Sequence, residues 1–209
     1  MSHLSAIVKS PSVSQADYYE AHADEYFTAT VGLDMSGVYE RFLNELVPGT
    51  HIADAGCGSG RDTKTFLQRG YVVTAFDGSP EMARVASAYS GQKCGVLQFQ
   101  DMQFQQEFDA IWACASLLHV PKHEMRNVLH RFFTALKPGG IIYASFIEGE
   151  GERIGADGRL YNSYTEESFR DLLGRIATIR EISCWKSDET SRPVERAPWL
   201  NFLVKTSTR

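Results

Sequence analysis

Hydrophobic and polar residues alternate along this chain in two recurring patterns. Short unbroken apolar runs, such as residues 141–146, are typical of strands that are buried on both faces. Between them, longer segments place apolar residues at helical spacing, and several of these segments begin or end at proline or glycine. The alternation predicts an α/β fold, in which a mostly parallel sheet carries helices on both faces.

The same pattern sets approximate boundaries. Expected helices cover about 15–26, 36–46, 59–68, 80–88, 122–136 and 165–175. Expected strands cover about 51–54, 72–76, 96–99, 108–113, 141–146, 179–185 and 200–206. Residues 1–14 are polar and contain Pro11, so a mobile tail is expected there. We expect a single domain over 1–209, with N-terminal helices over 15–47 and a core over 48–209.

The most informative segment joins the first expected strand to the next helix. Asp54 ends the apolar run, and glycines follow at positions 56, 58 and 60. Glycine lets the backbone turn tightly and lets a ligand approach it closely, and the following helix points its free N–H groups at the loop. The segment therefore predicts a nucleotide-type site at the carboxyl end of the first strand.

The glycine spacing distinguishes between kinds of nucleotide site. Dinucleotide-binding loops have the spacing G-x-G-x-x-G, whereas this loop has G-x-G-x-G, with Arg61 where the third glycine would be. The carboxylate of Asp54 suits an amine-bearing or cationic ligand better than a pyrophosphate, because like charges repel. Asp77 ends the next strand, where a carboxylate can accept ribose hydroxyls. These features disfavour a nicotinamide dehydrogenase.

Five ordered motifs resemble the class I S-adenosylmethionine-dependent methyltransferases. They are Asp54-x-Gly56-x-Gly58-x-Gly60, Asp77-Gly78-Ser79-Pro80-Glu81-Met82, Asp101-Met102, the segment 108–121 and Leu136-Lys137-Pro138-Gly139-Gly140. The motifs fall between about 52 and 146, nearly half of the chain. One glycine loop is weak evidence, whereas five motifs in the family's order are specific. The pattern is most similar to small bacterial-type enzymes of the ubiquinone-biosynthesis or tellurite-resistance kind.

The resemblance implies a fold and a reaction. The family has a Rossmann-like, doubly wound sheet of strand order 3-2-1-4-5-7-6, with an antiparallel hairpin at its C-terminal edge. Helices ahead of the sheet form a lid, which we expect of residues 15–47. Members transfer a methyl group from S-adenosylmethionine and release S-adenosylhomocysteine, so we expect an enzyme with this cofactor and without a metal.

The resemblance also implies cofactor contacts. Asp77 is expected to bind the ribose, Met82 to pack on the adenine and Asp101 to bind the adenine amine. Asp54 is expected near the methionine amine. The expected set is Tyr26, Asp54, Gly56, Gly58, Ser59, Gly60, Asp77, Gly78, Ser79, Met82, Asp101, Met102 and Ala115. Structural alternatives stay open, since Asp54 could cap a helix, Met82 could be core and Asp101 could be a solvated loop acid.

Candidates for the acceptor side lie largely outside these motifs. His119 follows the fourth strand and is a candidate general base, although family members that need no base also carry histidine there. Residues 148–164 are rich in glycine and charge, and an insertion at this place would form a lid over the substrate. Candidate acceptor contacts are Arg61, His22, Glu148, Arg153, Tyr161 and Tyr164. Exposed loop positions, or a local ion pair of Arg61 with Asp62, would explain the same residues.

Composition narrows the function classes. The chain has 209 residues, of which 43% are hydrophobic and 22% charged, as is ordinary for one soluble domain. Its net charge of −5 gives no general attraction for nucleic acid. Four cysteines without a C-x-x-C pair indicate a reduced, cytoplasmic setting. No apolar run approaches the roughly 20 residues that span a membrane, and no secretory signal is visible.

These observations favour methyl transfer to a small-molecule acceptor. Two alternatives stay open. One is a methyltransferase that acts on a macromolecule such as tRNA or protein, and the other is a cofactor-binding protein that regulates a partner without transferring methyl groups. The sequence does not identify the acceptor, and it leaves a monomer and a dimer equally open.

Overall fold

The computed structural model describes residues 15–187 and 198–208. Its strands are β1 (His51–Ala55), β2 (Val72–Asp77), β3 (Gly95–Val96), β4 (Phe108–Ala113), β5 (Leu136–Ile147), β6 (Glu152–Ile154), β7 (Leu160–Asn162), β8 (Ile179–Ser187) and β9 (Trp199–Thr206). Its α-helices are α1 (Gln15–Ala21), α2 (Ala23–Thr30), α3 (Ser36–Leu43), α4 (Arg61–Gln68), α5 (Pro80–Ser90), α6 (Lys122–Ala135) and α7 (Glu166–Gly174). Two 3₁₀ turns are η1 (Phe99–Asp101) and η2 (Leu117–His119).

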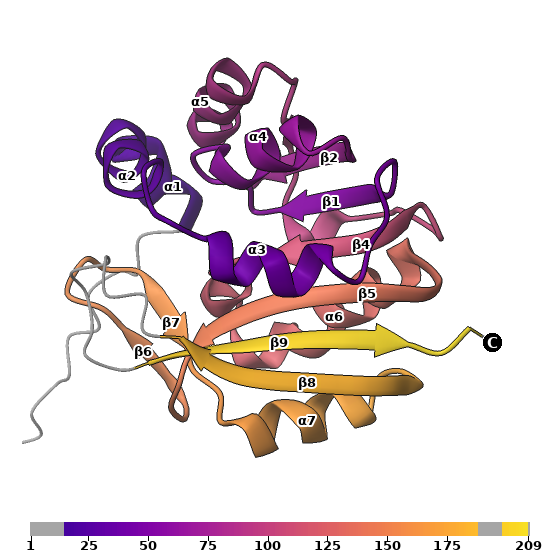
Figure 1. Cartoon of the computed structure of the whole chain (residues 1–209). Helices are drawn as coiled ribbons and strands as arrows, with labels where there is room; N and C mark the ends of the chain where they lie inside the picture. Colours follow the sequence, from indigo (N-terminus) through magenta and orange to yellow (C-terminus); the bar gives the residue numbers. More distant parts are fainter. Residues whose placement is uncertain (1–14, 188–197, 209) are drawn as a thin grey trace, which may run out of the picture.

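Seven strands form one sheet in the order β3-β2-β1-β4-β5-β9-β8. The strands from β3 to β5 run parallel, whereas β9 is antiparallel to both of its neighbours. The remaining strands, β6 and β7, pair only with each other. With this hairpin set aside, the strand order is 3-2-1-4-5-7-6, so the expected topology and its antiparallel edge are confirmed (Figure 1).

Helices cover both faces of the sheet, as a doubly wound fold requires. Alternate residues of a strand point to opposite faces. Ile111 and Ile142 therefore enter the core beneath α6 and α7, while Trp112 and Tyr143 enter the core beneath α3, α4 and α5. The rings of Trp112 and Tyr143 stack with centroids 4.0 Å apart. Both faces of the central strands are thus buried, which explains their unbroken apolar sequence.

The structure refines three expected boundaries. The first expected helix is divided into α1 and α2 at His22. The third strand ends at Val96, because a 3₁₀ turn begins at Phe99. The fifth strand begins at Leu136 instead of residue 141, and its register on β4 shifts where Gly139 adopts a φ of +78°. The Lys-Pro-Gly-Gly segment therefore forms an irregular part of β5, although its turn residues predicted a break.

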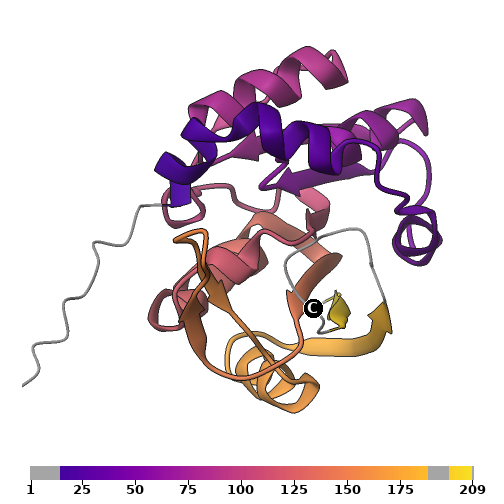
Figure 2. The same ribbon diagram turned by 90° about the vertical axis from the view of Figure 1, so that its left-hand side faces the viewer.

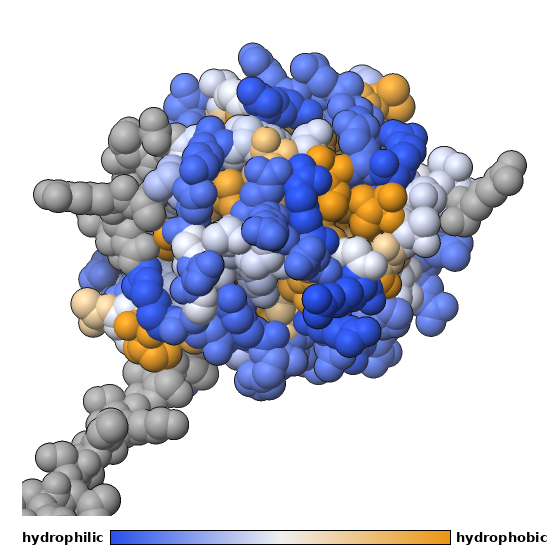
Figure 3. Space-filling view, turned by 90° about the horizontal axis from the view of Figure 1, so that it is seen from below, coloured by the Kyte–Doolittle hydropathy of each residue, from blue (hydrophilic) through white to orange (hydrophobic). Residues whose placement is uncertain are grey.

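Two segments distant in sequence lie at the edge where the parallel strands end. Figures 1 and 2 show α1 and α2 on one side of this edge and the β6–β7 hairpin on the other. The surface seen from below is mostly hydrophilic, with separate hydrophobic patches (Figure 3). None of the helices in the described part of the chain is long and apolar enough to cross a membrane.

Candidate functional site

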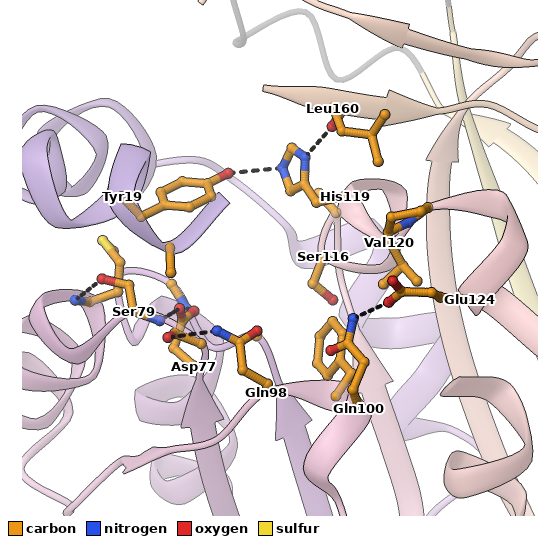
Figure 4. A pocket seen from close by; sticks show the side chains of 18 of the residues that line it. Tyr19, Asp77, Ser79, Gln98, Gln100, Ser116, His119, Val120, Glu124 and Leu160 are labelled. Atoms are coloured by element: carbon orange, nitrogen blue, oxygen red, sulfur yellow. Dashed lines mark hydrogen bonds between the residues drawn. The ribbon is translucent and has the colours of Figure 1, made fainter. Parts of the chain in front are cut away.

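A cavity of about 510 Å³ opens at the carboxyl ends of the parallel strands. Its wall comes from the loops after β1, β2 and β4, from η1, and from α1, α2 and the β6–β7 hairpin (Figure 4). This size is typical of small-molecule sites. Eight predicted cofactor contacts line the cavity: Tyr26, Gly56, Gly58, Asp77, Gly78, Ser79, Met82 and Ala115.

The glycine loop is fixed by backbone conformation and by lack of space. Gly56 has a φ of +79°, and a Cβ on it would lie 2.5 Å from Cβ of Ser116. Gly60 has a φ of +77°, and a Cβ on it would lie 2.8 Å from backbone atoms of Ala86. Residues other than glycine rarely adopt such φ angles, and Cβ atoms in real structures do not approach neighbouring atoms so closely. The loop is therefore packed between the end of β4 and helix α5, with Gly56 and Gly58 on the cavity wall.

Asp77 ends β2 and presents its carboxylate at the cavity. One oxygen accepts a hydrogen bond from the backbone N–H of Gly58 and the other from that of Ser79, both at 3.0 Å. Burial raises the pKa of Asp77, and the N–H groups of Ser79, Gly58 and Gly78 offset part of the rise. Each oxygen retains a lone pair, so the carboxylate can still accept hydrogen bonds from two neighbouring hydroxyls.

The loop after β4 holds a strained residue against the cavity. Ala115 has a φ of +50°, a conformation that costs about 1 to 2 kcal/mol for a residue with a Cβ. Its N–H donates to Oγ of Ser145 at 2.8 Å. The neighbouring Ser116 donates from Oγ to the carbonyl of Ala55, also at 2.8 Å. These bonds join β4, β5 and β1 at one point and keep the backbone of Ala115 on the cavity wall.

Five other predicted cofactor contacts lie outside the cavity wall: Asp54, Ser59, Gly60, Asp101 and Met102. Asp54 lies beneath the loop, where its carboxylate accepts from Oγ1 of Thr63 at 2.5 Å. Burial, and then the negative charge of Asp62, raises the pKa of Asp54. This bond ties the end of β1 to α4 beneath the loop, but it does not cap the helix, because the carboxylate meets a side chain and not a backbone N–H.

The turn η1 presents different residues to the cavity from those expected. Asp101 is exposed and Met102 is buried in the core. Phe99 and Gln100 line the cavity instead. The 3₁₀ turn rotates successive side chains by about a third of a circle, which directs Asp101 away from the site. Phe99 thus provides an apolar surface where the sequence placed an acidic side chain.

Arg61 does not reach the cavity. Its guanidinium makes two bonds to the carboxylate of Asp62, at 2.6 and 3.0 Å, and donates to the carbonyl of Thr30 at 3.3 Å. Tyr39 and Trp112 also donate to Asp62. Burial alone would raise the pKa of Asp62, but the charge of Arg61 and these hydrogen bonds hold it below its usual value. This is the local ion pair, and it joins α2, α3, α4 and β4 behind the loop.

His119 lies at the other end of the cavity, between α1 and the hairpin. Its Nε2 is 2.9 Å from the hydroxyl of Tyr19, and its Nδ1 is 2.7 Å from the carbonyl oxygen of Leu160 (Figure 4). A carbonyl can only accept, so Nδ1 carries a proton, and Nε2 of the neutral ring is the acceptor for the Tyr19 hydroxyl. The ring of Tyr161 packs on the imidazole with centroids 5.2 Å apart.

The remaining acceptor-side candidates do not line the cavity. His22 stacks on Tyr18 and contacts its carbonyl at 2.9 Å, and Glu148 pairs with Lys186 at 2.8 Å. Arg153 is exposed and lies over the ring of Tyr161. Tyr161 and Tyr164 are buried at the base of the hairpin. The two tyrosines therefore support the hairpin from within.

Several cavity residues were not predicted: Ala16, Tyr19, Gln98, Phe99, Gln100, Ser116, Val120, Pro121, His123, Glu124, Glu152, Ile154, Gly158 and Leu160. Of these, Tyr19 had a usable signal, because it precedes Tyr26 by two helical turns and could share its face. Their rings indeed meet edge to face at 5.1 Å. Glu152, Ile154, Gly158 and Leu160 lie within the segment 148–164 that was expected to form a lid, but no pattern singled out these individual residues.

Known proteins share this architecture. Residues 52–140 match the family model described as a methyltransferase domain. A ubiquinone biosynthesis O-methyltransferase from Xanthomonas campestris pv. campestris is 30% identical over 106 residues, which cover 47% of this chain and 44% of that protein. This chain therefore matches less than half the length of that relative. An S-adenosyl-L-methionine-dependent Diels-Alderase from Neonectria sp. is 27% identical over 177 residues, which cover 84% and 66% of the two chains.

A solved structure extends the likeness to nearly the whole chain. The 1,6-didemethyltoxoflavin-N1-methyltransferase of Burkholderia thailandensis superposes with a TM-score of 0.68 at 22% identity, over 96% of this chain and 93% of that one. It was solved with 1,6-didemethyltoxoflavin and S-adenosylhomocysteine bound. Residues 52–140 thus match a methyltransferase domain, and the sheet around them has the strand order that the motifs predicted.

Proposed function

We propose that this chain transfers a methyl group from S-adenosylmethionine to a small-molecule acceptor. The observation that carries the proposal is one continuous cavity that the glycine loop and Asp77 line at one end and Tyr19 and His119 at the other. The same pocket thus contains a binding site for a nucleoside and a group that can accept a proton. The methyltransferase-domain match supports this function, and the S-adenosylhomocysteine bound to the Burkholderia enzyme supports the cofactor.

The residues at the glycine-loop end fit the nucleoside of this cofactor. The half-buried carboxylate of Asp77 suits two ribose hydroxyls, and Met82 and Phe99 offer apolar surfaces for the adenine. Tyr26 packs against the loop, since a Cβ on Gly58 would lie 3.2 Å from its ring. When bound, S-adenosylmethionine supplies a methyl group that its sulfonium already activates. The protein then has to hold the acceptor in line and keep water away, which can lower the barrier by several kcal/mol.

The opposite end can take a proton from the acceptor. Nε2 of His119 lies 2.9 Å from the hydroxyl of Tyr19 and can accept its proton. A proton that arrives at the Tyr19 oxygen can therefore pass on to His119, and the Leu160 carbonyl holds the imidazole in place. Such a base contributes about 10² to 10⁴ in rate when the acceptor is an O–H or N–H group.

The charges of the lining favour an uncharged or cationic acceptor. Asp77, Glu124 and Glu152 line the cavity, and no lysine or arginine of the described residues does. An anionic group would meet like charges, and the guanidinium of Arg159 behind Tyr19 is already paired with Asp157. The carboxylate of Glu124 accepts from the Gln100 amide at 2.6 Å, so it is directed by a neighbour on the same wall (Figure 4).

A second candidate function is cyclisation of a bound substrate without methyl transfer. It is favoured by the Diels-Alderase similarity, which extends over more of this chain than the ubiquinone O-methyltransferase similarity does. The two functions differ in the fate of the cofactor, because only methyl transfer converts S-adenosylmethionine into S-adenosylhomocysteine.

Calorimetric titration tests the cofactor assignment. We expect micromolar binding of S-adenosylmethionine and S-adenosylhomocysteine, and no binding of a nicotinamide dinucleotide control. Folded protein that binds neither sulfur compound would overturn the proposal. Incubation with methyl-labelled S-adenosylmethionine and a metabolite extract then separates the two candidates. Label in a small-molecule product supports methyl transfer, whereas cofactor binding with an altered but unlabelled metabolite supports cyclisation.

A further inference from the structure

Arg159 is a buried cation next to the acceptor end of the cavity. Only 9% of its surface is exposed. Its Nε and Nη2 donate to Oδ2 of Asp157, at 2.9 and 2.7 Å, within the turn of the hairpin. Its guanidinium lies 4.5 Å from the ring centre of Tyr18 and 5.3 Å from that of Tyr161. These contacts leave Nη1, which donates to the hydroxyl oxygen of Tyr19 at 2.7 Å.

This bond determines where the proton of Tyr19 points. A guanidinium has five N–H donors and no acceptor, so the Tyr19 oxygen accepts from Arg159 and its own proton is directed elsewhere. Nε2 of His119 lies 2.9 Å away and, in the tautomer with the proton on Nδ1, accepts that proton in a hydrogen bond. The resulting chain of donors runs from Arg159 to Tyr19, then to His119 and finally to the carbonyl of Leu160.

Both ends of this chain belong to consecutive residues of the hairpin. Arg159 donates at one end, and Leu160 accepts at the other. Between them lie Tyr19 from α1 and His119 from η2, which are separated from Arg159 in sequence by 140 and 40 residues. A displacement of the hairpin would therefore release the hydroxyl of Tyr19 and the imidazole of His119 together. A contact that only stabilised the hairpin would not need to reach Tyr19 or His119.

From this geometry we infer that Arg159 is a positioning residue, which directs the Tyr19 proton to Nε2 of His119 and so completes the base only when the hairpin is seated on α1. The inference rests on the proposed function, in which this pair receives the proton of the acceptor. Lysine would not reproduce the role fully, because an ammonium lacks the planar fork that bonds Asp157 and Tyr19 at once.

The test uses the full chain with ¹⁵N-labelled histidine rings, saturated with S-adenosylhomocysteine. Long-range proton–nitrogen spectra report the tautomer of each imidazole, and the His119→Asn variant identifies the signal of His119. We expect the Nδ1–H tautomer in the wild type. In Arg159→Met, the preference for it should fall about tenfold, the equivalent of one hydrogen bond. Arg159→Lys should restore it in part, and Arg41→Met is the control, since Arg41 lies over the Trp185 ring and not at the cavity.

If Arg159 positions His119 through Tyr19, its effect requires the Tyr19 hydroxyl. Variants in a Tyr19→Phe background test this requirement. In a Tyr19→Phe background, Arg159→Met should change the His119 tautomer and the rate of label transfer no further. In the wild-type background it should lower that rate about tenfold and leave S-adenosylhomocysteine affinity within about threefold. If Arg159→Met does not fold, Arg159→Lys gives the comparison with a smaller expected effect in the wild-type background and none in the Tyr19→Phe background.

Two results would overturn the inference. One is a folded Arg159→Met variant with wild-type tautomer and rate, and the other is an undiminished effect of Arg159→Met in the Tyr19→Phe background. Failure of the wild-type protein to bind S-adenosylhomocysteine would count against the proposed function instead. The imidazole spectra of the ligand-free protein would then still decide whether Arg159 sets the His119 tautomer.

Discussion

The two ends of the cavity are built in different ways. At the glycine-loop end, the wall is formed mainly by backbone groups and one carboxylate. These come from consecutive strand–loop units at β1 and β2. At the His119 end, side chains from α1, η2 and the hairpin meet across long sequence separations. The first construction depends on local conformation, while the second depends on how distant elements dock. Substitutions at the two ends should therefore affect different steps.

The largest expected effect is at Gly60, and it would show how rigid the glycine-loop end is. Gly60→Ala places a Cβ 2.8 Å from the Ala86 backbone at a φ of +77°. We expect a loss of roughly 2 to 4 kcal/mol in the free energy of unfolding, and S-adenosylhomocysteine affinity reduced about a hundredfold. Urea unfolding and calorimetry measure the two. Gly37→Ala is the control, since Gly37 lies in α3 with open space around it. Equal behaviour of the two variants would contradict the assigned role of the loop.

The next effect concerns His119 and should separate turnover from cofactor binding. His119→Asn removes the proton acceptor but keeps an amide near the Leu160 carbonyl. We expect methyl transfer to a metabolite extract to fall about a hundredfold. S-adenosylhomocysteine affinity should stay within about threefold of the wild type, because the glycine loop and Asp77 are untouched. Normal turnover would rule out the base, and lost affinity would show that the two ends are not independent.

A substitution of Asp77 should do the opposite of His119→Asn, because it should lower cofactor affinity and leave His119 unchanged. Asp77→Ala removes the carboxylate that bonds Gly58 and Ser79 and that we assign to the ribose. We expect cofactor affinity to fall about tenfold or more in calorimetry, since a charged hydrogen-bond partner is lost. The tautomer of His119 should not change. An unchanged dissociation constant would exclude the ribose assignment.

The smallest expected effect is at Glu152, at the hairpin side of the cavity. Glu152→Gln removes one negative charge but can still accept from the N–H of Lys122, which lies 2.5 Å from its carboxylate. Because the residue is exposed, we expect only about a two- to threefold rise in the half-saturating concentration of a cationic acceptor. Glu150→Gln is the matched control, since Glu150 is exposed and does not line the cavity. The same shift in both variants would contradict a local charge preference.

The same contrast explains what the sequence could predict. The alternating apolar runs predicted the α/β class, whereas the strand order followed only from the family resemblance. The cap of α7 at Thr165 followed from a local pattern that forms a capping box. The glycine loop and Asp77 were found because backbone turns leave a signature in consecutive residues. His119 was found because chemistry in such sheets gathers at the carboxyl ends of strands.

Other features depend on packing that no local pattern records. Tyr19 and Arg159 are brought together only by the folded sheet, at a separation of 140 residues. The sequence left two interpretations of Arg61, and burial beside Asp62 favours the structural one. For Asp101, a single 3₁₀ turn decides which side chains face the cavity, and the strand pattern ahead of it did not predict that turn.

The separate pairing of β6 and β7 has a consequence for how this protein can diversify. Neither strand joins the seven-stranded sheet, so insertions and exchanges in the hairpin leave the register of that sheet unchanged. The hairpin nevertheless contributes Glu152, Ile154, Gly158 and Leu160 to the cavity. Under the proposed function, acceptor preference can therefore change through exchanges in the hairpin that keep Arg159 and the Leu160 carbonyl in place, while the sheet and its glycine loop stay constant.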